Sequence, residues 1–200
     1  MNNLLIDLYE SAATMLPFFI VYAFLSKKPR KLPHFIIAFI FACYIFAVYH
    51  FTNTGTLYDL LFYKLSHTAD IINLKPFSMT IDWVGYLQNI LLFIPLGMLL
   101  PLFFKRPNFL LCTLYGTLFS LMLECSQLLN KRSSDVDDLI MNTLGAIIGY
   151  LLYKLILERL LKSKLQGLLG LEPLFYILAM FAGRFFFYNE LGLAKMLYGF

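Results

Sequence analysis

Charged residues are scarce in this 200-residue chain: they make up 14% of it, against 60% for hydrophobic residues. A soluble globular protein carries about 25% charged residues. The composition therefore excludes an ordinary soluble domain and indicates an integral membrane protein. The net charge is only +4, and the basic residues fall in short clusters between apolar runs. That distribution is typical of a membrane protein and argues against nucleic acid as a partner.

Cysteine and histidine are also few, with three residues of each. Cys43, Cys112 and Cys125 all lie inside apolar runs, and an odd number of scattered cysteines does not form a disulfide framework. No Cys and His spacing resembles a zinc site. No Ser-His-Asp or Cys-His arrangement is evident either. We therefore expect no metal and no cofactor, and the sequence leaves open whether the protein is an enzyme.

A basic N-terminal region is missing as well. Residues 1–10 contain Asp7 and Glu10 but no lysine or arginine, whereas a signal peptide begins with positive charge. The basic cluster 27–31 follows the first apolar run instead. We therefore expect the first helix to be retained, with its N-terminus outside the cell.

Apolar runs of spanning length dominate the rest of the chain, and a helix needs about 20 apolar residues to cross a bilayer. Backbone groups in hydrocarbon must be hydrogen-bonded within the segment, so these runs predict helices. The last run is short and contains Arg184, so a tilted or interfacial helix is the alternative there. The predicted fold is an all-α, polytopic transmembrane bundle of about six spans. The spans are 8–25, 32–51, 87–104, 109–129, 139–157 and 173–188.

The lysine and arginine distribution predicts the orientation, because cytoplasmic loops are enriched in both. The basic residues at 27–31, 105–106 and 154–164 outnumber those on the opposite side. The loops holding them are therefore expected in the cytoplasm. Both termini, the long loop 52–86 and the hairpin 130–137 are expected outside. Within the long loop, leucines at helical spacing predict a short amphipathic helix over 56–66.

Polar side chains interrupt the facing ends of two neighbouring apolar runs. Glu124 and Gln127 are three residues apart and share a helical face, as do Asp138 and Asn142, four apart. The short hairpin makes the two helices antiparallel neighbours, so the two faces can meet. Glu124 is then roughly 9 Å deep from the hairpin. We expect an outward-facing polar pocket that includes Asn89, and we hypothesise that a kink at Pro95 turns Asn89 toward Asn142.

The functional interpretation competes with a structural one. Buried Asn and Gln often only join helices, but an unpaired carboxylate such as Glu124 costs about 2.5–3.5 kcal/mol in a bilayer. Either Arg132 or Arg184 could neutralise it, so a structural ion pair and a catalytic or ligand-binding role both remain open. Asp137 fits neither helical face and is expected to be a solvated hairpin residue. His34 and His50 are expected as interfacial anchors.

Several motifs, in this order and spacing, resemble the VanZ-like family of bacterial membrane proteins. The similarity covers 32–153. It adds Arg132 and Asp135 to the polar cluster, and it makes Asn73, Pro76 and Phe77 a loop motif that is expected to fold back over the helix ends. The motifs are Asn73-Leu74-Lys75-Pro76-Phe77, then Asn89 with Leu92-Phe93-Ile94-Pro95-Leu96-Gly97, then Glu124-x-x-Gln127, then Arg132-x-x-Asp135-x-x-Asp138-x-x-x-Asn142-Thr143-x-Gly145.

The resemblance covers the middle one of three expected parts of the chain: residues 1–31 with the first helix and a cytoplasmic basic loop, a VanZ-like core over 32–157 with four helices and the outer loop, and residues 158–200 with a cytoplasmic amphipathic linker and the sixth helix. It also implies low-level resistance to teicoplanin, a lipid-tailed glycopeptide that binds cell-wall precursors. The expected partners are membrane lipids and a lipid-linked cell-wall precursor or lipoglycopeptide.

Two other functions compete with this expectation. One is an intramembrane enzyme acting on a lipid-linked envelope molecule, with Glu124 or Asp138 as general acid or base. The other is a small transporter. Against a transporter, the polar residues occupy only the outer half of the expected bundle, and no polar stripe continues through the inner half.

Overall fold

The computed structural model describes residues 3–25, 32–63, 72–78, 82–130, 132–160 and 170–188. Long helices dominate these segments. The α-helices are α1 (Asn3–Leu25), α2 (Leu32–Phe51), α3 (Leu57–Tyr63), α4 (Trp83–Leu99), α5 (Phe109–Gln127), α6 (Val136–Leu152), α7 (Glu158–Leu160) and α8 (Glu172–Phe187). Helical turns extend three of them: η2 (Leu100–Phe103), η3 (Leu128–Asn130) and the π-turn η4 (Tyr153–Leu157). Two short strands, β1 (Ile72–Asn73) and β2 (Ser134–Asp135), pair in parallel.

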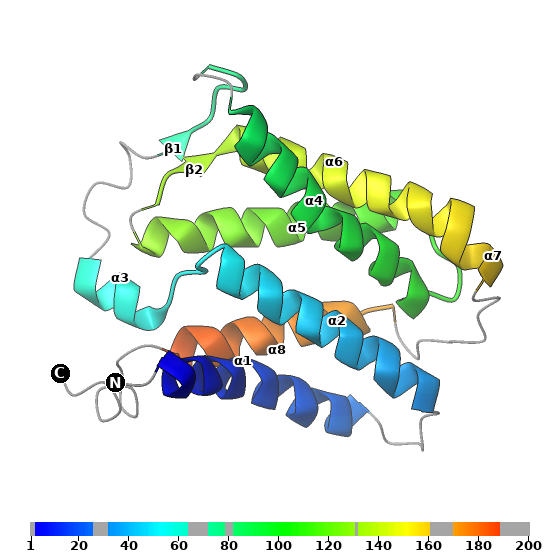
Figure 1. Ribbon diagram of the computed structural model, residues 1–200, viewed down its shortest axis with the longest axis horizontal. Coiled ribbons are helices and arrows are strands. Elements are labelled where there is room, and N and C mark those ends of the chain that lie inside the picture. Colours follow the sequence, from blue (N-terminus) through cyan, green and yellow to red (C-terminus); the bar gives the residue numbers. More distant parts are fainter. Residues whose placement is uncertain are drawn as a thin grey trace.

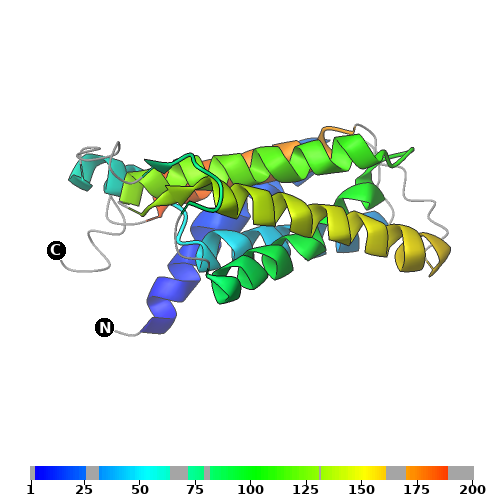
Figure 2. The same ribbon diagram turned by 90° about the horizontal axis from the view of Figure 1, so that it is seen from above.

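The long helices lie side by side between two ends of the molecule (Figure 1). The start of α1, the end of α8, α3 and the two strands gather at one end, which we call the strand end, and α7 lies at the other. Seen from above, α1 is inclined to the other long helices (Figure 2). The described residues of loop 52–86 and of the 130–137 connection therefore share an end with the first turns of α1 and the last turns of α8, as predicted.

Five helices are long and apolar enough to cross a membrane within the described segments, which confirms a multi-pass helical membrane protein. They are α1, α2, α4 with η2, α5 with η3, and α6 with η4 and α7. The helix α8 has 16 residues, or roughly 24 Å at helical rise, against a hydrocarbon core of about 30 Å. It packs along α1, and its crossing of the bilayer stays a prediction.

Glycines bring α4 and α6 into close contact. A Cβ on Gly149 would lie 2.0 Å from the carbonyl oxygen of Ile94, and one on Gly97 would lie 2.0 Å from that of Ala146. Gly145 and Gly149 form the small-xxx-small spacing that lets membrane helices approach backbone to backbone. This close contact places the first turns of α4 and α6 next to each other at the strand end.

The helix α2 supplies the centre of the apolar core. Its residues Phe41, Ile45 and Tyr49 have no exposed surface, and α2 lies between the α1–α8 pair and the group formed by α4, α5 and α6 (Figure 1). Large apolar side chains such as Leu110 and Phe24 are more than two-thirds exposed on the periphery. An outer surface of this kind suits contact with lipid.

Acidic caps move the helix starts from the predicted positions. The helix α4 begins at Trp83 rather than 87, because the Asp82 side chain accepts hydrogen bonds from the backbone N–H groups of Val84 and Gly85. The helix α6 begins at Val136 rather than 139, because Asp135 caps it through the N–H of Asp137. The predicted outer helix at 56–66 corresponds to α3, and residues 64–66 lie outside the described segments.

Candidate ligand pocket

A cavity of about 660 Å³ opens at the strand end. Every member of the predicted polar cluster except Asp135 lines it. The lining residues are Phe51, Thr52, Gln88, Asn89, Leu92, Leu123, Glu124, Gln127, Arg132, Ser133, Asp138 and Asn142. The helices α4, α5 and α6 and the loop after α2 thus contribute to one site, as the facing argument predicted for α5 and α6.

Glu124 is 5% exposed and accepts two hydrogen bonds from the segment that enters α6. Its Oε2 lies 3.0 Å from the Ser134 hydroxyl and 3.3 Å from the backbone nitrogen of Asp135. The predicted ion pair with Arg132 or Arg184 is wrong. Arg132 donates to the carbonyl of Thr52 at 2.9 Å, and Arg184 pairs elsewhere. Neutral donors therefore hold this carboxylate, and no arginine of the described segments forms an ion pair with it.

Asn89 and Asn142 line the same cavity but do not meet. The Asn89 amide donates to Asp138 at 2.6 Å, whereas that of Asn142 donates to the hydroxyl of Ser120 on α5 at 2.9 Å. The predicted approach of Asn89 to Asn142 is wrong, because the α4–α6 contact brings Asn89 opposite the first turn of α6 and Asn142 lies one turn further along. Asp138 thus has a neutral donor at one oxygen.

The loop motif packs against the start of α6. Residues Ile72 and Asn73 pair with Ser134 and Asp135 in the two-stranded sheet. The Asn73 amide lies 3.2 Å from both carboxylate oxygens of Asp135. The prediction that this stretch folds back over the helix ends is therefore confirmed, and Asp135 acts as a cap and strand residue rather than as a wall of the cavity.

Asp137 is not the solvated hairpin residue predicted from its position off both helical faces. It is 2% exposed and accepts hydrogen bonds from the Phe77 backbone nitrogen at 2.8 Å and the Tyr86 hydroxyl at 2.5 Å. Phe77 has a positive φ of 54°, which is unusual for an aromatic residue and follows a turn at Pro76. The loop motif and the first turn of α4 therefore each supply a donor that helical periodicity in α6 does not reveal.

The carbonyl of Thr52 holds two of the side chains that line the cavity. It accepts a hydrogen bond from Arg132 and another from the Gln127 amide at 3.3 Å. The next carbonyl, of Asn53, accepts from the Asn130 amide at 2.6 Å. Sequence reasoning missed this role because a backbone acceptor has no signature in the amino-acid sequence.

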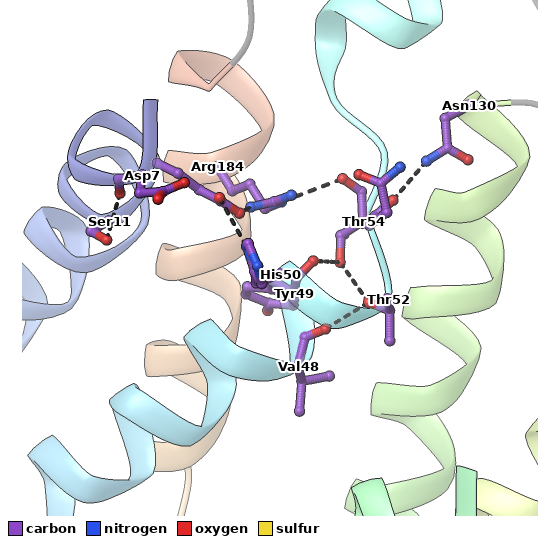
Figure 3. Close-up of polar contacts among 11 residues, drawn as sticks. Asp7, Ser11, Val48, Tyr49, His50, Thr52, Thr54, Asn130 and Arg184 are labelled. Atoms are coloured by element: carbon purple, nitrogen blue, oxygen red, sulfur yellow. Dashed lines mark hydrogen bonds and ion pairs between the residues drawn. The ribbon is translucent and has the colours of Figure 1, made fainter. Parts of the chain in front are cut away.

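A second polar cluster, formed by Glu10, His50 and Arg184, lies beside the cavity. Arg184 is 2% exposed and forms an ion pair with Glu10, whose other oxygen is 2.9 Å from Nδ1 of His50. Figure 3 shows Arg184 pointing toward the segment after α2, where its Nε donates to the carbonyl of Thr54 at 3.4 Å. His50, predicted as an interfacial anchor, joins α2 to α1 through this contact. His34 likewise contacts Glu172, at 3.0 Å.

The chemistry of the pocket is that of carboxylates and amides. Within the described segments, no group of three or more His, Cys, Asp or Glu side chains is arranged to hold a metal ion. Two carboxylates, one guanidinium and several amides share the cavity with the apolar side chains of Phe51, Leu92 and Leu123. A site of this kind can bind a molecule that is partly polar and partly apolar.

These features define a multi-pass helical membrane protein with an acidic, partly apolar cavity at one end of its bundle. The chain belongs to the VanZ/LLP1 family, whose model matches residues 35–157. It is 33% identical over 96 residues to "Protein VanZ" of Enterococcus faecium, and this match covers 48% of the chain and 60% of that relative. No solved structure matches. The family match includes every residue that lines the cavity and excludes both Glu10 and Arg184.

Proposed function

We propose that the protein acts in the bacterial cell membrane to lower sensitivity to teicoplanin-type glycopeptides, by holding an amphiphilic envelope molecule in an outward-facing pocket. The observation that carries this proposal is the composition of the cavity wall, where Glu124, Asp138 and Asn142 face the same space as Leu92 and Leu123. A lipid-linked precursor or a lipid-tailed glycopeptide combines the two chemistries that such a wall accommodates. The family membership supports the link to glycopeptides.

The test is resistance in a glycopeptide-sensitive Gram-positive host that expresses the chain. We expect the inhibitory concentration of teicoplanin to rise, and that of a glycopeptide without a lipid tail to rise less. Glu124→Gln should abolish the increase at normal membrane levels, because Gln keeps the shape but loses the charge. Glu158→Gln is the matched control, since Glu158 lies in α7 at the far end of the bundle. Equal shifts for both drugs would contradict a site beside the acyl chains.

An enzymatic function is the second candidate, favoured by the two carboxylates in one cavity. Glu124 and Asp138 are held by neutral donors rather than by cations, so either is able to exchange a proton with a bound substrate. The purified protein should then convert a lipid-linked precursor at a rate that falls when Asp138→Asn removes one carboxylate. Resistance without any conversion of the precursor would favour binding alone.

A further inference from the structure

The cavity carries more negative than positive charge. Glu124 and Asp138 line it, and Arg132 is the one cationic residue among its lining residues. Asp135, whose backbone nitrogen donates to Glu124, and Asp137 precede Asp138 in the same segment of the chain. None of these four carboxylates forms an ion pair in the part of the chain that the structure describes. A bound group of positive charge would therefore be favoured electrostatically, and a bound anion would meet like charge.

The two lining carboxylates also retain open acceptor atoms. Oε2 of Glu124 receives both of that residue's hydrogen bonds, and Oδ1 of Asp138 receives the one from Asn89. No donor among the described residues reaches Oε1 of Glu124 or Oδ2 of Asp138. Since an ionised carboxylate offers about four lone-pair sites, both side chains have unused capacity to accept hydrogen bonds.

Asn142 provides independent evidence, because its side-chain oxygen lacks a hydrogen-bond donor among the described residues. The residue is 5% exposed and lines the cavity. One end of its amide is bonded to Ser120, while Oδ1 is buried without a partner within the described segments. Buried polar atoms are normally paired, so this open amide end is a place where a bound molecule would complete the hydrogen bonding.

We propose that the pocket recognises the primary ammonium group of an amphiphile, an inference that rests on the proposed function. An ammonium group has three N–H donors and no acceptor, which matches the open oxygens of Glu124, Asp138 and Asn142. The apolar side chains of Leu92 and Leu123 in the same wall provide a surface for the adjoining hydrocarbon. The ammonium group could belong to an aminophospholipid or to an amine-bearing lipoglycopeptide, and the chemistry of recognition is the same for both.

The experiment measures binding of three eight-carbon probes to the purified full chain in an uncharged detergent by isothermal titration calorimetry. The probes are octylamine, octanol and octyl phosphate, which share the tail and differ in the headgroup. Octylamine should bind at least ten-fold more tightly than the other two. Glu124→Gln and Asp138→Asn should each weaken octylamine binding about ten-fold or more, and Glu158→Gln should leave it unchanged.

Preferential binding of octyl phosphate, which would then point to Arg132, would overturn the proposal. So would octylamine binding that is undiminished in the Glu124→Gln, Asp138→Asn double variant. Competition against octylamine by phosphatidylethanolamine in nanodiscs, or by teicoplanin, distinguishes the two sources of the amine. If the chain confers resistance but shows no preference for octylamine, only this inference fails. If octylamine binds as expected without any resistance, the proposed function fails instead.

Discussion

Arg184 and Glu10 form an ion pair across 174 residues of sequence, and both side chains are almost completely buried. The pair joins α8 to α1, and Arg184 also reaches the carbonyl of Thr54. That carbonyl lies two residues from Thr52, which holds Arg132 and Gln127 in the cavity wall. Segment 52–56 is thus shared by the buried ion pair and the candidate pocket, although the family match does not extend to either charged residue.

Breaking this pair should destabilise the bundle. Glu10→Gln leaves Arg184 buried without its counter-charge, and the loss of one partner of a buried pair costs about 3–5 kcal/mol. We expect a lower midpoint of thermal unfolding in detergent, measured by intrinsic fluorescence. Combining it with Arg184→Met removes the unpaired charge and should restore part of the midpoint.

The matched control for the buried pair is Lys154→Met at the other end of the bundle. Lys154 and Glu158 form an exposed i,i+4 pair on a single helical segment, and surface pairs of this kind contribute little to stability. Its unfolding midpoint should therefore stay at the wild-type value. A Glu10→Gln protein as stable as the Lys154→Met protein would contradict a stabilising role for the buried pair.

The orientation predicted from the lysine and arginine distribution places the strand end outside the cell. In a chain whose native cysteines are replaced by alanine, a cysteine at Ser78 should react with an impermeant thiol reagent added to intact cells. A cysteine at Lys105 should react only after the membrane is permeabilised, because residue 105 lies in the opposite loop. Both positions are exposed. The reverse labelling pattern would place the pocket in the cytoplasm.

The helices could be predicted from the sequence, because apolar runs of spanning length have few other structures available in lipid. The antiparallel contact of α5 and α6 also followed, since a short connection leaves little choice. The starts of α4 and α6 did not, because each helix begins where a side chain, that of Asp82 or Asp135, caps its first backbone N–H groups. Hydropathy alone does not register a side-chain cap.

The sequence predicted which residues line the cavity better than it predicted the hydrogen bonds and ion pairs that they form. Spacing within α5 and within α6 predicted that Glu124 and Asp138 face one cavity. Their hydrogen-bond and ion-pair partners depend on which helices approach closely. Arg184 could have reached either Glu10 or Glu124 on charge alone, and the packing of α8 on α1 decides for Glu10. The donors to Asp137 are the backbone nitrogen of Phe77 and the hydroxyl of Tyr86. A backbone donor cannot be predicted from the type of a residue, because almost every residue has one.

The close approach of α4 and α6 should not tolerate a side chain at Gly149. A Cβ there would lie 2.0 Å from the carbonyl oxygen of Ile94 and 2.9 Å from Cα of Gly97, so the two backbones would have to separate. We expect Gly149→Val to reduce the amount of membrane-inserted, monodisperse protein, measured by fluorescence-detected size exclusion. Leu144→Val on the exposed face of the same helix is the control and should behave as wild type. Normal recovery of Gly149→Val would show that the contact is dispensable.

Asp137 should hold the loop motif against the start of α6. Asp137→Asn removes the charge that strengthens both hydrogen bonds, and it replaces one accepting oxygen by an NH₂ group, which cannot accept the hydrogen bond that this oxygen received. The loss of a hydrogen bond to a charged group costs about 1.5–3 kcal/mol, so local opening of 72–78 should become roughly 10- to 100-fold more frequent. Amide hydrogen exchange of a peptide covering this loop should accelerate accordingly, while exchange in α2 stays unchanged.

Two variants separate this effect from a general loss of charge at the strand end. Asp82→Asn removes an exposed carboxylate at the same end of the bundle, but Asn caps a helix about as well as Asp does, so exchange at 72–78 should not change. Tyr86→Phe removes one of the two donors and should produce an intermediate acceleration. If Asp137→Asn and Asp82→Asn give the same exchange rates for the loop, Asp137 does not anchor it, and the burial of its carboxylate needs another explanation.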